Sequence, residues 1–144
     1  LLIKEINMNK KEFNKSISFK LPEIIYSFKD IYNFLENEKK VNFIGNSVSL
    51  AKAFFMKNNN NKKFDLKNKI ICIKSADPGY DFIFSQKIAG LITEFGGVNS
   101  HMAIRCAELS IPAAIGVGQN KFKNIINSKV IRLDCETSKV DLIK

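Results

Sequence analysis

Apolar residues recur at helical spacing over residues 1–40. Leu2, Ile6 and Phe13 can share one face of a first helix. Ser27 precedes Asp30 by three residues in a capping-box pattern, so a second helix is expected to begin there. The apolar positions of this second helix follow the i, i+3, i+4, i+7 pattern and are Phe28, Ile31, Tyr32 and Leu35. We therefore expect residues 1–40 to form a helical arm or linker that comes from a preceding domain.

The pattern is weaker over residues 41–69. Residues 41–44 suit a strand, whereas the alanines and phenylalanines of residues 49–57 suit a helix or a strand equally well. Residues 58–69 are polar and rich in lysine and asparagine, which is typical of a surface loop. Composition alone therefore leaves the structure of residues 49–57 open.

From residue 70 onward, short apolar runs alternate with helical patterns. Strands are expected at residues 70–73, 88–93, 113–117, 130–133 and 140–143. Residues 80–86 should form a short helix with Phe82 and Ile83 facing inward, and residues 100–109 should form another. Strands that alternate with short helices predict a layered α/β domain, which we place at residues 41–144.

Length and cysteine content narrow the class of protein. The 144 residues fit one domain with an additional arm, and the first residue is Leu1, so the chain is compatible with a piece of a longer protein. No apolar run approaches the roughly 20 residues of a membrane span, and no secretory signal pattern opens the chain. The three cysteines lack metal-binding spacing, so we expect no metal site and a reducing cytoplasm.

The net charge of +9 suggests nucleic-acid binding, but its distribution argues against it. Residues 1–69 hold fourteen lysines and seven acidic residues, whereas residues 70–144 hold nine basic and seven acidic residues. The basic residues are almost all lysines, with Arg105 and Arg132 the only arginines. Proteins that bind single strands interleave arginines with aromatic residues. We therefore expect no nucleic-acid partner and no membrane partner.

The chain has one histidine, His101, and its position predicts chemistry. His101 follows a glycine pair and Ser100, so it falls on the first residue of the helix expected at residues 100–109. The first turn of a helix presents unpaired N–H groups and partial positive charge, which attract anions. Imidazole is partly neutral at neutral pH and is then a competent nucleophile. A lone histidine is more often structural, but this context favours a phosphoryl-accepting role.

The neighbours of His101 have both a structural and a functional interpretation. Gly96 and Gly97 fit a turn that needs positive φ, and they would also allow a phosphate close to the backbone. Ser100 is a helix cap whose hydroxyl could contact the phosphoryl group. Asn99 is a turn residue or a partner that fixes the imidazole tautomer. Arg105 lies four residues after His101 on one helix face and is either a planar donor pair for phosphate or a solvated arginine.

The run from Gly96 to Ile104, followed by residues 111–116 (Ile-Pro-Ala-Ala-Ile-Gly), resembles the phosphohistidine signature of PEP-utilising enzymes. The resemblance spans about residues 68–144. It implies a swivelling β/β/α domain, and it favours strands over residues 42–57, which match the opening β-hairpin of that family. It also implies that His101 takes a phosphoryl group from ATP on an ATP-grasp domain and delivers it to a small-molecule acceptor on another domain of the same polypeptide. ATP and Mg²⁺ would bind to those partner domains, and this domain itself would bind no cofactor.

The sequence departs from the family pattern at two positions. Many members carry arginine six residues after the histidine, where this chain has Ala107, and Arg105 is a candidate replacement. Ser110 stands where the family usually has glycine before the Ile-Pro pair.

The acceptor is suggested only by a second resemblance. Residues 77–85 (Asp-Pro-Gly-Tyr-Asp-Phe-Ile-Phe-Ser) look like synthase-like proteins of bacterial capsule pathways, which include enzymes that phosphorylate the amide nitrogen of L-glutamine. Pyruvate and an antibiotic hydroxyl are the alternative acceptors. A function of another class is a non-catalytic interaction module that keeps the carrier fold for docking.

Overall fold

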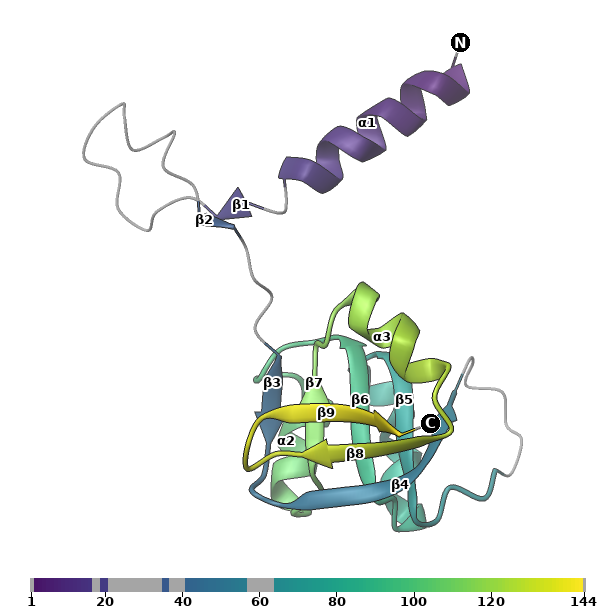
Figure 1. Cartoon of the computed structure of the whole chain (residues 1–144), viewed down its shortest axis with the longest axis vertical. Coiled ribbons are helices and arrows are strands. Elements are labelled where there is room, and N and C mark those ends of the chain that lie inside the picture. Colours follow the sequence, from purple (N-terminus) through teal and green to yellow (C-terminus); the bar gives the residue numbers. More distant parts are fainter. Residues whose placement is uncertain (1, 17–18, 21–34, 37–40, 57–63, 144) are drawn as a thin grey trace, which may run out of the picture. The chain divides into compact units, whose positions relative to one another are not determined.

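The computed structural model describes residues 2–16, 19–20, 35–36, 41–56 and 64–143, and these form two compact units, Leu1–Glu38 and Lys39–Lys144 (Figure 1). We call the second unit the sheet domain.

The first unit contains one helix and one short strand pair in its described residues. The helix α1 spans Leu2–Ser16, and all its side chains are exposed. Strand β1 (Phe19–Lys20) pairs antiparallel with β2 (Leu35–Glu36). The first helix of the expected arm is thus present, but Leu35 lies in a strand rather than in a helix. Helical periodicity could not reveal this pairing, because the two strands lie far apart in sequence. The helix expected from Ser27 otherwise lies outside the described residues.

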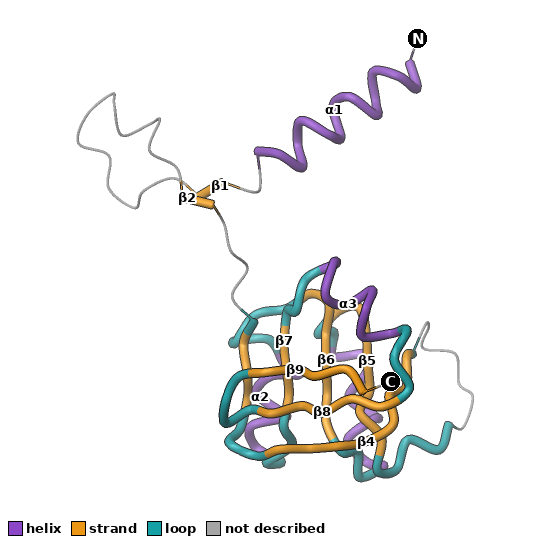
Figure 2. The backbone as a smooth tube through the Cα atoms, in the orientation of Figure 1, coloured by secondary structure: helices purple, strands orange, loops and turns teal. Residues whose placement is uncertain are grey.

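The sheet domain is built on one seven-stranded sheet in the order β3-β7-β6-β5-β4-β8-β9 (Figure 2). The pairs β4-β5, β5-β6 and β6-β7 are parallel, and β3-β7, β4-β8 and β8-β9 are antiparallel. The strands span Asn42–Ile44 (β3), Val48–Phe55 (β4), Lys69–Ser75 (β5), Gly90–Phe95 (β6), Ala113–Ile115 (β7), Val130–Asp134 (β8) and Lys139–Ile143 (β9).

The sheet curls so that β4, β8 and β9 fold over the central strands (Figure 1). Because side chains alternate across a strand, β5 serves two cores. Ile70 and Cys72 join the core enclosed by the curl, and Ile71 and Ile73 join the core on the other face. A strand buried on both faces reads as a continuous apolar run, which is why β5 was recognisable in the sequence.

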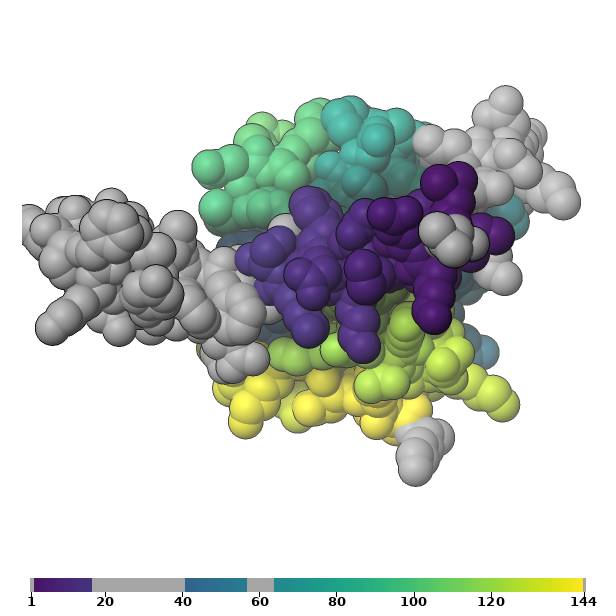
Figure 3. All heavy atoms as spheres, turned by 90° about the horizontal axis from the view of Figure 1, so that it is seen from above, coloured from purple at the N-terminus to yellow at the C-terminus, as the bar shows by residue number. Residues whose placement is uncertain are grey.

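Three helices pack against the sheet in the described part of this domain. The 3₁₀ helix η2 (Pro78–Gln86) and α2 (His101–Glu108) contribute to the core on the outer face, and α3 (Gln119–Ile126) contributes to the core inside the curl. Figure 3 accordingly shows the teal and green segments on one side of the domain and the yellow C-terminal strands on the other. The domain therefore has a β/β/α layering, as expected.

Three local expectations differ from the structure. The strands β3 and β4 do not form a hairpin: β3 pairs with β7, and β4 lies between β5 and β8. The helix α3 was not expected, because its eight residues carry only a short apolar pattern. Phe82 is 44% exposed, whereas Ile83 is fully buried. A nine-residue 3₁₀ helix turns through 120° per residue, so adjacent positions cannot both face the sheet.

Candidate functional site

The turn after β6 is held by a close crossing of two glycines. Gly96 has φ +139°, and a β-carbon there would lie 2.7 Å from the Cβ of Ala76. Gly116 has φ +74°, and a β-carbon there would lie 2.5 Å from the Gly96 carbonyl oxygen. The Thr93 hydroxyl accepts a hydrogen bond from the Gly116 N–H (3.0 Å). This crossing fixes the segment that leads into α2.

Gly97 differs from its neighbour. It is not among the described residues with positive φ, so the expectation that both glycines need this conformation is wrong for Gly97. A β-carbon at Gly97 would have no atom within 4 Å. Its carbonyl oxygen accepts a hydrogen bond from the Ser100 N–H (3.0 Å), which closes the turn. The backbone at Gly97 is therefore open to a close approach from outside.

The helix α2 begins where the sequence predicts. Ser100 is the N-cap, and its hydroxyl oxygen accepts a hydrogen bond from the Ala103 N–H (3.4 Å). Met102, Ala103 and Cys106 face the outer core. Because residues one and two turns apart share a face, His101, Arg105 and Glu108 lie on the outer side of the helix. The His101 side chain is 42% exposed, so solvent reaches the imidazole.

Asp81 is the hydrogen-bond partner of the imidazole. Its Oδ1 lies 3.0 Å from Nε2 of His101. Asp81 comes from η2, which begins where the Asp77 side chain accepts a hydrogen bond from the Gly79 N–H (2.8 Å). The hydrogen bond to His101, aided by the nearby Arg105 guanidinium, lowers the pKa of Asp81. Asp81 is thus a carboxylate at neutral pH and accepts a hydrogen bond from the Nε2–H group.

Arg105 donates to the same oxygen. Its Nε lies 3.2 Å from Asp81 Oδ1, and its Nη1 lies 3.0 Å from Oε2 of Glu108. Its guanidinium carbon lies 5.8 Å from the ring centroid of Phe84. These two carboxylates raise the pKa of Arg105, and the hydrogen bond to Glu108 is the largest single cause. Arg105 is therefore held in place beside the imidazole rather than freely solvated.

The structure brings most of the predicted site residues together and adds Asp81 to them. Ser100, His101 and Arg105 lie on the first turns of α2, and the two glycines form the segment before it. Asn99 is exposed in the turn, and the imidazole makes its hydrogen bond to Asp81 rather than to Asn99. Sequence reasoning missed Asp81, which lies 20 residues before His101. The only available signal was an acidic residue in the helix expected at residues 80–86.

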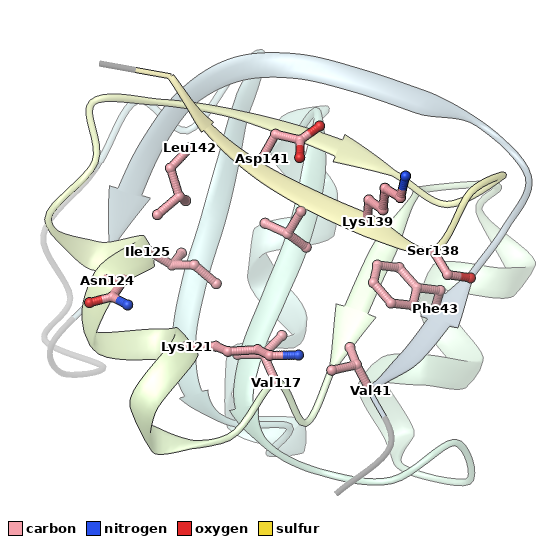
Figure 4. A pocket seen from close by; sticks show the side chains of 11 residues that line it. Val41, Phe43, Val117, Lys121, Asn124, Ile125, Ser138, Lys139, Asp141 and Leu142 are labelled. Atoms are coloured by element: carbon pink, nitrogen blue, oxygen red, sulfur yellow. The ribbon is translucent and has the colours of Figure 1, made fainter. Parts of the chain in front are cut away.

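The described residues offer this site no cluster of metal ligands, and the pocket described below lies elsewhere in the domain. The described residues contain no group of three or more histidine, cysteine, aspartate or glutamate side chains that could hold a metal ion. A pocket of about 360 Å³ lies between α3, β9 and β3, and its lining includes Ile125, Val117 and Phe43 (Figure 4). Ile125 and Val117 belong to the core inside the curl, whereas α2 packs on the outer face. Among the helices that the structure describes, none combines the length and the apolar composition that a membrane span requires.

One solved structure agrees with the fold. The solution NMR structure of a UPF0107 protein aligns with a TM-score of 0.56 at 11% identity, covering 72% of this chain and 97% of that one. This level of similarity concerns the fold alone. The NMR structure of an Enzyme I protein aligns with a TM-score of 0.43 at 23% identity, covering 59% of this chain and 33% of that one.

Sequence comparison identifies the family. Pyruvate kinases from several Staphylococcus aureus strains, including USA300 and NCTC 8325, are 36% identical over 76 residues. That match covers 53% of this chain and only 13% of the relatives' length. Residues 64–138, just over half of the chain, match the family described as "PEP-utilising enzyme, mobile domain". The matched stretch includes Asp81, His101 and Arg105, and the chain therefore belongs to the family of mobile domains of PEP-utilising enzymes.

Proposed function

We propose that this domain carries a phosphoryl group on His101 from one partner domain of the same polypeptide to another. The observation that supports this most directly is the placement of the imidazole. His101 is half-exposed, lies on the first residue of α2 and follows a turn whose backbone is open at Gly97. A histidine with only a packing role would be expected inside the core.

The chemistry of this placement suits reversible phosphoryl transfer. An imidazole nitrogen forms a bond to phosphorus while the bond from phosphorus to the donor's leaving oxygen breaks, and the leaving oxygen keeps the electron pair. Transfer of this kind depends mainly on positioning and on neutralising charge. The N–H groups of the first turn of α2 supply part of that neutralisation, and Arg105 is in reach to supply more. The proposed phosphate-binding set is completed by Gly96, Gly97, Asn99 and Ser100.

In this proposal, the phosphoryl donor and the phosphoryl acceptor bind to other domains. The donor is ATP with Mg²⁺ on an ATP-grasp domain, and ATP ends as AMP and phosphate. The preferred acceptor is L-glutamine, which with ATP and water would yield glutamine phosphate, AMP and phosphate. The support for glutamine is the resemblance of residues 77–85 alone. Pyruvate and an antibiotic hydroxyl are the competing acceptors.

Labelling of the intact protein tests the carrier role. With Mg²⁺ and ATP labelled in its β- and γ-phosphates, the wild type should gain an acid-labile, base-stable label on His101. The His101→Asn variant should bind ATP, gain no label and form no product. Asn124→Ala, at an exposed position of α3, is the matched control and should label as the wild type does. Normal turnover by His101→Asn would refute the carrier role.

The acceptor needs a separate screen. The labelled intact protein is mixed with L-glutamine, pyruvate or a hydroxylated antibiotic, and loss of label from His101 is measured together with AMP release. Transfer to glutamine supports the preferred reaction, and transfer to one of the others replaces it. A folded intact protein that never gains label would favour the non-catalytic interaction module.

A further inference from the structure

We propose that the Asp81 carboxylate occupies the place of the phosphoryl group in the resting domain and must leave when His101 is phosphorylated. This inference rests on the proposed carrier function and adds a positioning residue to it. Two donors, Nε2 of His101 at 3.0 Å and Nε of Arg105 at 3.2 Å, converge on one carboxylate oxygen of Asp81. A nucleophilic nitrogen and a planar cation aimed at one anionic oxygen form the arrangement that a phosphoryl group on that nitrogen requires.

The resting contact prevents attack by Nε2. A carboxylate can only accept a hydrogen bond, so Nε2 carries a proton while the contact lasts. A protonated ring nitrogen has no free electron pair with which to attack phosphorus. The bond from Nε2 to phosphorus would also be far shorter than the 3.0 Å that now separates Nε2 from Asp81 Oδ1, and it would point at that oxygen. Phosphorylation at Nε2 therefore requires Asp81 to withdraw.

Arg105 identifies Nε2 as the accepting nitrogen. In the described part of the chain, Arg105 is the cation that donates a hydrogen bond to the same oxygen as the imidazole, Asp81 Oδ1. The imidazole reaches that oxygen through Nε2, so Arg105 lies on the Nε2 side of the ring. Nδ1 lies next to Cβ and is the more hindered nitrogen of any histidine. We therefore expect Arg105 Nε to donate its hydrogen bond to a phosphoryl oxygen instead of to Asp81. The hydrogen bond from Arg105 Nη1 to Glu108 is expected to remain.

Phosphoryl transfer to Nε2 begins with a change of imidazole tautomer. The proton on Nε2 passes to solvent and Nδ1 takes one from solvent, which leaves an electron pair on Nε2. That pair forms the bond to phosphorus, and the bond to the donor's leaving group breaks. With a phosphoramidate as donor, the leaving nitrogen takes a proton and departs as ammonia. The Asp81 carboxylate then faces a phosphoryl dianion, and like-charge repulsion keeps it withdrawn.

Small-molecule phosphorylation of this chain tests the inference. Wild type, Asp81→Asn and Asp141→Asn are treated with potassium phosphoramidate, and Nε2-phosphohistidine is followed by ³¹P NMR. Removing the competing charge should raise the initial rate in Asp81→Asn by about two- to fivefold, the range expected for a half-exposed charged hydrogen bond. Asp141→Asn is the matched control because Asp141 is also a half-exposed carboxylate beside an arginine, Arg132, but lies on β9 rather than beside the imidazole, and it should stay within about twofold of wild type.

Two further readouts separate this role from simple support of the fold. The Arg105 Nε–H resonance should move when wild type is phosphorylated, and Asp81→Glu, which restores a carboxylate, should return the rate toward that of wild type. An Asp81→Asn rate equal to or below wild type would overturn the inference. So would a product phosphorylated on Nδ1 with the contact between Asp81 and Nε2 retained.

The two proposals fail in different experiments. If the intact enzyme never transfers label from Mg-ATP to His101, the carrier function is refuted whatever the phosphoramidate rates show. If that transfer occurs and Asp81→Asn leaves the phosphoramidate rate unchanged, only the role of Asp81 is refuted.

Discussion

The Gly96 carbonyl oxygen lies against the backbone of Gly116, where a β-carbon on Gly116 would come within 2.5 Å of it. These residues follow β6 and β7, which are neighbouring parallel strands. The loops after them therefore leave the same edge of the sheet and cross there. Because α2 starts four residues after Gly97, the crossing also sets where His101 is presented.

Gly116→Ala should destabilise the domain strongly. The β-carbon would clash with backbone rather than with a flexible side chain, and alanine would be held at φ +74°. We expect a loss of about 2 kcal/mol or more in the free energy of unfolding, measured by urea denaturation. Gly97→Ala is the control, since its β-carbon meets nothing within 4 Å, and it should cost less than about 1 kcal/mol. Equal losses in both variants would contradict this account.

Ser110→Gly should stabilise the domain. Ser110 follows α2 with φ +54°, in the left-handed region that glycine adopts at little cost. Its N–H donates to the Ala107 carbonyl, a bond that glycine preserves. We expect a gain of about 0.5–1 kcal/mol in the free energy of unfolding. Ser128→Gly, at a position that is not among the described residues with positive φ, should give no such gain.

The contribution of Asp81 to stability should depend on pH. Folding lowers the pKa of Asp81 below its usual value of 3.8. A carboxylate with a depressed pKa stabilises the folded state above its unfolded-state pKa and loses that effect as the pH falls through the lowered value. Wild type should therefore be more stable than Asp81→Asn at pH 5. The gap should close as the pH is lowered from about 4 toward 2. A gap that widens over this range in urea unfolding curves would contradict the assignment.

The buried thiols should resist alkylation in the folded protein. Burial raises the pKa of Cys72 and of Cys106 to about 12. The thiolate is the reactive form, so little of it exists at pH 8. Iodoacetamide should leave both thiols unmodified in native buffer and alkylate them fully in urea, as read by mass spectrometry. Rapid alkylation of either one without urea would show that its core is open.

The sequence predicted the strands and the helix that carry the site because their signals are local. The run at β5 and the Ser100 cap both came from neighbouring residues, and both are confirmed. The placement of His101 at the start of α2 followed from that cap. The same reasoning could not show that β3 pairs with β7 rather than β4, because strand pairing is decided between residues far apart in the chain.

By itself, the sequence determined that one imidazole would stand at a helix start after a glycine turn. Only the tertiary structure decided what surrounds that imidazole. Asp81 and His101 belong to different helices, and packing of η2 and α2 against the same face of the sheet brings their side chains within hydrogen-bond distance. No periodicity or spacing encodes that distance, since it depends on how two elements settle on a shared core.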